Sequence, residues 1–527
     1  MCKGIRAFTS EYDLYLQDES RKKGYADTVS FPVSVEEVSE TVRYCAGKGI
    51  TVTVQGSGTG VGGGAVPFGG HLMSLERMKY LRMGADGRSV IAGAGCSLNE
   101  MNVFIKRETG GKLFFPPDPT EGTASAGGMV SCNSSGARTY RYGPVRNYVK
   151  RLKVVLADGE IIDIERNRIF ASGRYISIDI KRGGETVAVP GADKEPPAYN
   201  NTTEEKRRIK LPGYVMPEVK NAAGYYVKND MDLIDLFIGA EGTLGIITEA
   251  EFLLEEKPRY IWGVISFFER EDMGIEFSQL LKSKKNASPG IMSIEFFDSG
   301  SLKILRDRKK ESPSEMSSPV IPERFREAVF TEIAADSLKE MGKAVKLIEV
   351  CIEKAGGKPD DAWVAGSSRS FESFKQLRHA TPEGVNAKIA AVKKQHPRIT
   401  KLGSDMSVPD GCFRETVKMY KTDLEKAGLN YVMFGHIGNS HLHVNIISRN
   451  EEEYSEGKRI FMKWAERTGR INGSISAEHG VGKLKRDFLV SMYGQKAVDE
   501  MRELKKIFDP GGILGRDNIF VWNKEKI

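Results

Sequence analysis

Residues 55–65 read QGSGTGVGGGA, with six glycines in eleven positions. The stretch follows Ile50–Val54, whose β-branched residues predict a strand, and the apolar spacing from Pro32 to Gly49 predicts a helix before that strand. Glycine permits positive φ and lets backbone N–H groups approach a ligand closely, so such a loop can hold a pyrophosphate. It is not a Walker loop, because no Gly-Lys-Ser/Thr follows. Taken alone, the stretch fits a flexible loop equally well.

Two further loops have the same character. Residues 115–138 read FPPDPTEGTASAGGMVSCNSSGAR, and residues 239–247 read GAEGTLGII and lead into a predicted strand. Small hydrogen-bonding side chains and a narrow backbone surface suit an extended dinucleotide ligand. Three such loops within the first half of the chain are hard to explain as simple turns.

The composition limits the protein class. A chain of 527 residues is expected to form two or more domains, and 40% hydrophobic with 28% charged residues is typical of a globular protein. The net charge of +7 is spread along the chain without a basic stripe, which argues against a nucleic-acid partner. No apolar run reaches the roughly 18 residues of a membrane span, and the N-terminus lacks a secretory pattern. We therefore expect a cytoplasmic protein, and peripheral attachment to the inner face of the membrane stays open.

The six cysteines predict no metal or disulfide framework. None lies within three residues of another, so the chain has no CxxC pair for zinc or an iron–sulfur cluster. We expect buried free thiols. If the protein transfers electrons, its carrier is then an organic cofactor, and the next acceptor is a separate molecule.

The ordered motifs resemble a known family. GSGTGVGGGA, PPDPTEGTASAGGM, NSSGAR with RYG, KNAAGYY and GAEGTLGIIT resemble the FAD-binding domain of the vanillyl-alcohol-oxidase-type (PCMH-type) flavoproteins, and most of all the D-lactate, glycolate and D-2-hydroxyglutarate dehydrogenase branch. The resemblance implies an α+β fold with a two-subdomain FAD-binding domain at residues 1–258. Within it, residues from about 166 to 217 are charged and contain Pro and Gly, and this composition predicts an inserted surface loop. An α+β substrate (cap) domain with an antiparallel sheet would follow at residues 259–450. Helices in residues 451–527 would return to complete the FAD site.

The resemblance also implies which residues contact FAD. The first loop would wrap the pyrophosphate, the second would lie along the flavin, and the third would complete the pocket. In order, the implied contacts are Gly56, Ser57, Gly58, Thr59, Gly60, Pro117, Asp118, Thr123, Gly127, Gly128, Asn133, Ser135, Gly136, Glu241, Gly242, Gly245 and Ile247. None of these loops contains a histidine, so we expect non-covalent FAD and a structural or surface role for nearby His71.

Four of the seven histidines fall in two short segments, FGHIGNSHLHVN at residues 434–445 and SISAEHGVGK at residues 474–483. Two imidazoles and a carboxylate with open positions suit zinc or another divalent ion. A hydrogen-bonded histidine cluster in a polar core is the alternative. His441 and His443 are two residues apart, so on a strand they would face the same side.

The family resemblance assigns roles in these segments. It implies His436, His443 and Glu478 as ligands of a divalent metal, zinc first with iron or manganese as alternatives, and His479 as the catalytic base. Asn445 would lie beside the substrate. Arg378 would hold the substrate carboxylate, for which a guanidinium fork is better suited than a lysine.

Three departures from the family pattern leave questions open. The usual Asp-Gly-Asn is Asn439-Ser440-His441 here, so His441 can join or replace a ligand, and a metal-free site stays an alternative. Lys401 is offset by two residues from a substrate lysine of some relatives, which favours a substrate without a second carboxylate. The C-terminal Leu-Asn-Pro-Gly is Leu514-Gly-Arg-Asp517, which leaves one flavin contact in doubt.

The implied function is an FAD-linked dehydrogenase that oxidises a small D-2-hydroxy acid, D-lactate to pyruvate as first choice, by hydride transfer to flavin N5. The electrons would pass to an external acceptor, which is an electron-transfer flavoprotein, an iron–sulfur protein, a cytochrome or a quinone. Homodimer formation and association with a redox complex stay open. The alternatives are a non-redox flavoenzyme similar to alkylglycerone-phosphate synthase and a flavin subunit of a larger electron-transfer complex.

Overall fold

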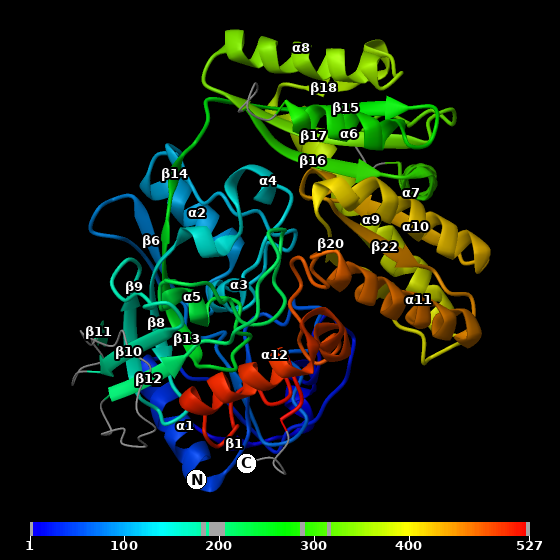
Figure 1. The fold of residues 1–527 in the computed structure, drawn as a ribbon. Helices are drawn as coiled ribbons and strands as arrows, with labels where there is room; N and C mark the ends of the chain where they lie inside the picture. The colour runs from blue at the N-terminus through cyan, green and yellow to red at the C-terminus, as the bar shows by residue number, and fades with distance from the viewer. Residues whose placement is uncertain (1–3, 181–185, 189–205, 285–289, 314–317, 523–527) are drawn as a thin grey trace.

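The computed structural model describes residues 4–180, 186–188, 206–284, 290–313 and 318–522 (Figure 1). The N-terminal half of the chain, drawn in blue to green, forms a lower body, and a larger sheet with its helices forms the upper body. The last long helix, drawn in red, returns to the lower body. This arrangement confirms the predicted α+β fold with an antiparallel cap sheet.

The first sheet confirms the helix and strand predicted before the glycine loop. Its strand order is β1-β2-β4-β3, and β4 runs parallel to both β2 and β3. The helix, α1, is capped by Ser34, whose side chain accepts a hydrogen bond from the Glu37 N–H. It ends at Gly49, which has φ of 64°. The elements are β1 (Arg6–Ala7), β2 (Thr28–Ser30), α1 (Val35–Lys48), β3 (Val52–Gln55) and β4 (His71–Ser74).

A second, antiparallel sheet completes the lower body, with strand order β5-β6-β13-β8-β9. The central strand β13 is buried along nearly its whole length, since it is covered on both faces. The third glycine loop leads into it. The elements are β5 (Leu81–Met83), β6 (Ser89–Gly93), α2 (Leu98–Glu108), α3 (Ala126–Ser131), β8 (Val149–Val155), β9 (Ile161–Glu165) and β13 (Ile246–Leu253).

The stretch 166–217, whose composition suggested a surface loop, contains three antiparallel strands in the order β11-β10-β12. They are β10 (Tyr175–Ile180), β11 (Thr186–Ala188) and β12 (Lys206–Lys210). Ile176 and Ile178 alternate with polar residues and are fully buried, which is the strand signal that the charged composition concealed. Residues 181–185 and 189–205 of this stretch lie outside the described residues.

The upper body is built on one large antiparallel sheet with strand order β18-β15-β17-β16-β21-β22-β19, and β20 also pairs with β22. The strands are β15 (Tyr260–Phe268), β16 (Ile291–Phe297), β17 (Glu327–Ala335), β18 (Trp363–Ala365), β19 (Leu402–Gly403), β20 (Met406–Ser407), β21 (Tyr431–Gly435) and β22 (His441–Ile446). The helices are α6 (Met273–Ser283), α7 (Ser299–Glu311), α8 (Leu338–Lys354), α9 (Ser368–Lys393), α10 (Phe413–Lys426) and α11 (Glu451–Arg470).

Helix α12 (Arg486–Phe508) is anchored to the lower body by a buried lysine. The Lys505 ammonium donates to the backbone carbonyls of Thr243 and Leu514 at 2.7 and 2.8 Å and to Asp509 Oδ2 at 2.7 Å. A buried ammonium requires such partners, because an unpaired one would be strongly destabilising. The third glycine loop and the C-terminal segment are therefore held together.

Two negative findings follow for the described part of the chain. None of its helices is both long and apolar enough to cross a bilayer. The five cysteines that the structure describes are all free thiols, but only Cys45, Cys96 and Cys351 are buried as expected, whereas Cys132 and Cys412 are partly exposed.

His71 has the structural role that its position suggested. It lies fully buried on β4, with Nε2 2.7 Å from the Ser30 hydroxyl and Nδ1 2.9 Å from the Thr28 hydroxyl. Burial lowers the pKa of His71 from 6.5 to about 4, so the folded protein keeps the ring neutral where the unfolded chain takes up a proton. This contribution to stability is complete above pH 6.5 and is lost as the pH falls toward 4.

We expect acid to lower the free energy of unfolding of the wild-type protein more than that of a His71→Gln variant. Between pH 7 and pH 5 the free energy of unfolding should fall by about 2 kcal/mol more in the wild type. Only in the wild type does unfolding expose an imidazole that takes up a proton in this pH range. Urea denaturation of both proteins at the two pH values measures the difference. Equal pH slopes would contradict a buried neutral His71.

Candidate functional site

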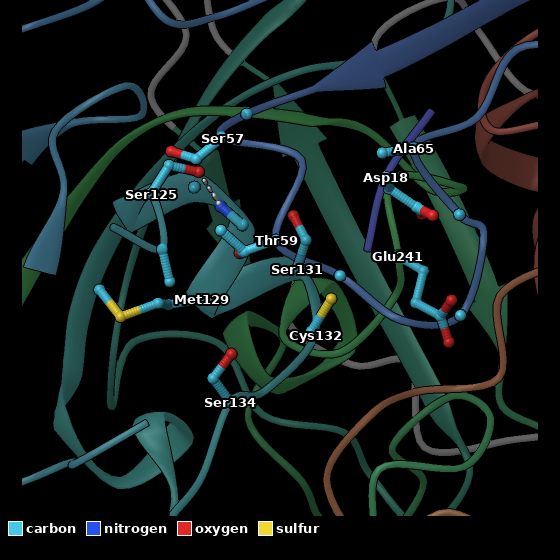
Figure 2. A pocket seen from close by; sticks show the side chains of 18 of the residues that line it. Asp18, Ser57, Thr59, Ala65, Ser125, Met129, Ser131, Cys132, Ser134 and Glu241 are labelled. Carbon is cyan, nitrogen blue, oxygen red and sulfur yellow. Dashed lines mark hydrogen bonds between the residues drawn. The ribbon is translucent and has the colours of Figure 1, made fainter. Parts of the chain in front are cut away.

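The three glycine loops wall one cavity of about 340 Å³ (Figure 2). Twelve of the predicted FAD contacts line it: Gly56, Ser57, Gly58, Thr59, Gly60, Gly127, Gly128, Ser135, Glu241, Gly242, Gly245 and Ile247. Five others, all in the second loop, are not among the lining residues: Pro117, Asp118, Thr123, Asn133 and Gly136. The structure thus brings the three loops together as one site, and the contact of those five with FAD stays a prediction.

The first two loops approach each other too closely for side chains. A Cβ on Gly56 would lie 2.1 Å from the Ser125 hydroxyl and 3.1 Å from the Ser125 Cβ, so a larger residue there would force the Ser125 side chain to move. Ser125 in turn caps α3, because its hydroxyl accepts a hydrogen bond from the Gly128 N–H at 3.3 Å (Figure 2). Gly58 has φ of 68°, a conformation that other residues adopt at a cost.

The cavity has the properties of a cofactor cradle. A Cβ built on Gly60 or Gly242 would meet no atom within 4 Å, so bare backbone faces open space at both positions. The Asp18 side chain also lines this space, and its buried Oδ2 has no hydrogen-bond partner among the described residues (Figure 2). Since an unpartnered buried acceptor is costly, a ligand that brings hydroxyl donors and lies on peptide groups fits here. FAD has these features.

Several lining residues come from parts of the chain that local patterns could not connect. Asp18 lies before the first loop, and Gly515 and Asn518 lie near the end of the chain. The Asn518 amide donates to the carbonyls of Gly64 and Glu241, both at 3.1 Å, and accepts from the Lys483 ammonium at 2.7 Å. The altered C-terminal motif therefore still contributes to the cavity wall.

Glu241 fastens the third loop to the segment that contains Glu478 and His479. Its carboxylate accepts hydrogen bonds from the N–H groups of Val481 and Gly482, both at 2.7 Å. Burial raises the pKa of Glu241 to about 7. The cavity wall and the second histidine segment are thereby fixed relative to each other.

The predicted metal ligands meet at one end of the cap sheet. His436 follows β21, Ser440 turns the chain with φ of 50°, and β22 begins at His441. The His441 and His443 rings lie 4.5 Å apart between centroids, which confirms that they face the same side. Glu478 Oε1 lies 3.2 Å from His436 Nε2 and 3.1 Å from His443 Nε2.

A lysine that the sequence analysis did not single out completes this cluster. The Lys220 ammonium lies 2.5 Å from Glu478 Oε2, and its side chain is 3% exposed. Burial alone would raise the pKa of Glu478, but Lys220 and His436 hold it well below its usual range. Lys220 opens the KNAAGYY motif quoted above, so the available signal was its place in a motif rather than its chemistry.

His436 is held from the opposite side by a second carboxylate. Its Nδ1 lies 2.7 Å from Glu295 Oε1. Burial opposes the charge on the ring, but Glu295 and Glu478 raise the pKa of His436 to about 9. His436 therefore carries positive charge between two carboxylates.

His479 lies next to Asp405, which is completely buried. Its Nδ1 is 3.4 Å from Asp405 Oδ2, and its Nε2 is 3.7 Å from Glu478 Oε1. Asp405 also binds the Lys485 ammonium at 2.7 Å. Removal from bulk water lowers the pKa of His479 to about 4, although Asp405 acts in the opposite direction. The ring is thus neutral at pH 7 and can accept a proton.

Arg378 and Asn445 lie on two different elements of the upper body. The Arg378 guanidinium, on α9, is 3.7 Å from Asp118 Oδ2 and only 10% exposed, which excludes an ordinary surface salt bridge. Burial disfavours its charge, but Asp118 and then Glu295 raise its pKa. Asn445 is buried on β22 two residues after His443 and therefore shares its face of the strand.

The cluster and the cavity share a wall, because Glu478 and His479 also line the cavity between the glycine loops. A ligand in the cavity therefore lies directly beside a carboxylate and a neutral imidazole, and Glu478 links the cavity to the other histidines of the cluster. This juxtaposition places a proton acceptor beside a cofactor site.

The donor set fits a divalent cation. Bonds of about 2.1 Å to nitrogen and oxygen place neighbouring donors roughly 3.0–3.4 Å apart in octahedral or tetrahedral geometry. The 3.1 and 3.2 Å distances from Glu478 Oε1 to His443 and His436 fall in that range. Imidazole with carboxylate is a ligand set for zinc, iron or manganese.

Two protein-family models match the chain. The model described as FAD binding domain matches residues 26–165, and the model described as FAD linked oxidases, C-terminal domain, matches residues 276–519. Together they include the first two glycine loops and both histidine segments. The third glycine loop lies between the two matched ranges.

Curated relatives cover nearly the whole chain. A D-lactate dehydrogenase of Archaeoglobus fulgidus is 28% identical over 92% of this chain and 89% of its own length. The glycolate oxidase subunit GlcD of Bacillus subtilis is 26% identical over 95% and 90%, and a D-2-hydroxyglutarate dehydrogenase of Xanthomonas citri pv. viticola is 27% identical over 93% and 89%.

Solved structures share the fold. The 4-ethylphenol oxidase of Gulosibacter chungangensis has a TM-score of 0.66 at 16% identity and covers 100% of this chain and 95% of its own. A p-cresol methylhydroxylase has a TM-score of 0.66 at 14% identity, covering 98% and 94%. An alkyldihydroxyacetonephosphate synthase has a TM-score of 0.61 at 12% identity, covering 97% and 82%.

We expect Gly242→Ala to weaken FAD binding at least about tenfold, because the new methyl group would enter the open cavity. Gly87→Ala is the matched control: Gly87 also has positive φ and open space around a built Cβ, but it lies in the turn between β5 and β6. Both variants bear a similar backbone cost. Fluorescence titration of the stripped proteins with FAD measures both affinities, and an equal loss in both variants would count against the cradle.

Proposed function

This chain belongs to the PCMH-type FAD-binding flavoprotein family, in the branch of D-lactate, glycolate and D-2-hydroxyglutarate dehydrogenases, and we propose that it oxidises a small D-2-hydroxy acid. Our first choice of substrate is D-lactate, with pyruvate as product. The observation that carries the proposal is the wall shared by the glycine-loop cavity and the histidine cluster, through Glu478 and His479.

The proposed chemistry divides the work among the side chains. Arg378 binds the substrate carboxylate, and Asn445 lies beside the substrate. His479, neutral at pH 7, accepts the hydroxyl proton. Asp405 orients this ring through Nδ1 and leaves Nε2 directed toward Glu478.

FAD and a divalent ion each supply one part of the proposed chemistry. FAD, bound non-covalently in the cavity, supplies the acceptor for the hydride from C2. A divalent ion held by His436, His443 and Glu478 supplies positive charge that favours loss of the hydroxyl proton. The substrate loses one proton and one hydride in all, and two electrons leave the protein to an acceptor other than NAD.

The preference for D-lactate is supported by two D-lactate dehydrogenases among the relatives, at 28% identity each. The two-residue offset of Lys401 also favours a substrate with one carboxylate. The electron acceptor is proposed only by class: an electron-transfer flavoprotein, an iron–sulfur protein, a cytochrome or a quinone.

Two other functions have an observation in their favour. A non-redox flavoenzyme would agree with the fold shared with alkyldihydroxyacetonephosphate synthase, at 12% identity. A flavin subunit of a complex would agree with the similarity to a glycolate oxidase subunit. Neither explains as directly why a neutral imidazole lies at the cavity wall.

The test is anaerobic absorbance of the FAD-loaded protein on addition of D-lactate, L-lactate, glycolate or D-2-hydroxyglutarate, with and without a chelator. We expect D-lactate to bleach the flavin band, and chelation to slow or abolish the bleaching. Bleaching by another hydroxy acid would keep the reaction class and change the substrate. A flavin that none of the four acids reduces would refute the proposal and favour the non-redox or subunit function.

We expect Arg378→Lys to raise KM for the hydroxy acid at least tenfold with a smaller effect on kcat, since lysine keeps the charge but loses the bidentate fork. The control is Arg369→Lys, at an exposed position on the same helix. Steady-state kinetics with an artificial electron acceptor measures both variants. An unchanged KM in Arg378→Lys would remove this residue from the substrate site.

A further inference from the structure

We infer that His441 is a fourth protein ligand of the divalent ion, so that three imidazoles and Glu478 hold it. This inference rests on the proposed function, which puts an ion in the cluster. The inference goes beyond the proposed function because the family motif has asparagine where this chain has His441.

Each of the three imidazoles has one nitrogen facing an acceptor on the outside of the cluster. His436 Nδ1 lies 2.7 Å from Glu295 Oε1, and His443 Nδ1 lies 3.1 Å from the Ser404 carbonyl oxygen. His441 Nε2 lies 3.1 Å from Asp405 Oδ1. Carboxylate and carbonyl oxygens only accept, so each ring can direct an N–H outward while its other nitrogen is turned toward the interior of the cluster.

The inner nitrogens are His436 Nε2 and His443 Nε2, which lie 3.2 and 3.1 Å from Glu478 Oε1, and His441 Nδ1, which lies 3.5 Å from the Lys220 ammonium. A divalent ion that binds here replaces the proton that His436 carries without it. Metal-binding histidines in proteins are characteristically held in this way, with the second nitrogen donating to a carboxylate or a backbone carbonyl. His441 has the same orientation, with Nε2 close to Asp405 Oδ1 and Nδ1 turned inward, although its Nε2 makes no hydrogen bond with the described residues.

The Lys220 ammonium is a positive charge that already lies close to both His441 Nδ1 and Glu478. The Lys220 ammonium lies 3.5 Å from His441 Nδ1 and 2.5 Å from Glu478 Oε2. An ammonium only donates, so it faces the His441 lone pair. The ammonium and a divalent ion therefore compete for the same two acceptors.

The distances allow all four side chains to bind one ion. One ligand atom from each of His436, His441, His443 and Glu478 can be chosen so that all lie within 4.8 Å of one another. Opposite donors of an octahedral ion are about 4.2 Å apart with bonds of roughly 2.1 Å. Small side-chain movements therefore suffice.

Four protein ligands also restrict the identity of the ion. A tetrahedral zinc would be saturated by them, whereas a substrate that binds the ion needs at least one open position. An ion that accepts five or six ligands, such as manganese or ferrous iron, meets both requirements. The extra histidine thus favours manganese or iron over zinc.

The decisive comparison is the FAD-loaded wild type against His441→Asn, which introduces the residue of the family motif. Each protein is stripped with chelator and dialysed against Mn²⁺ or Zn²⁺, and bound metal is measured by mass spectrometry. We expect His441→Asn to bind Mn²⁺ at least tenfold more weakly and to lose the preference for Mn²⁺. Lys220→Met should bind both ions more tightly, because the competing ammonium is gone.

Flavin absorbance and circular dichroism check that the variants are folded, and His441→Gln replaces His441→Asn if the latter fails this check. Equal Mn²⁺ affinity in wild type and variant would overturn the inference and make His441 a bridge between Lys220 and Asp405. Binding of neither ion by the wild type would also overturn it. The bleaching test above decides separately whether the protein is a hydroxy-acid dehydrogenase.

Discussion

The Glu478 carboxylate is a nearly buried charge, and its need for partners joins three distant segments of the chain. Lys220 reaches it from the lower body, and His436 and His443 reach it from the end of the cap sheet. Taking a carboxylate out of water costs several kcal/mol unless charged and hydrogen-bonding partners replace the water. The lower body, the cap sheet and the C-terminal segment therefore meet at one carboxylate.

The same constraint acts at the other buried charges of the site. Asp405 Oδ2 accepts hydrogen bonds from the Ser476 hydroxyl, the Lys485 ammonium and the backbone N–H of His479, and Oδ1 accepts one from the Glu478 N–H. Glu241 takes two backbone N–H groups from the loop that follows His479. A segment of irregular backbone is thus held by carboxylates from both bodies. This fixed geometry is what a base that acts beside a cofactor requires.

Bare backbone in the cavity and dense charge in the cluster have complementary tasks. The cavity leaves peptide groups and one unpartnered carboxylate oxygen for a ligand with phosphates and hydroxyls. The cluster concentrates imidazoles and carboxylates at one end of it. The proposed dehydrogenase needs both, because a hydride and a proton must leave neighbouring atoms of one substrate. In this proposal His441 and Lys220 determine which cation the cluster accepts.

The sequence by itself determined the fold class, the three glycine loops and the histidine segments. These are local patterns: glycine spacing, strand alternation and short motifs each act within a few residues. It also indicated that His441 and His443 share a face, because the strand period is two. The sequence did not lead us to predict the strands around Ile176, because they lie within a charged stretch.

Only the tertiary structure decided that Lys220, Asp405 and Glu295 complete the cluster, and that Asp18 and Asn518 line the cavity. No local pattern distinguishes a lysine that neutralises a buried carboxylate from one on the surface. Their partners lie up to hundreds of residues away, and burial, which makes each pairing necessary, is a property of the packed chain alone.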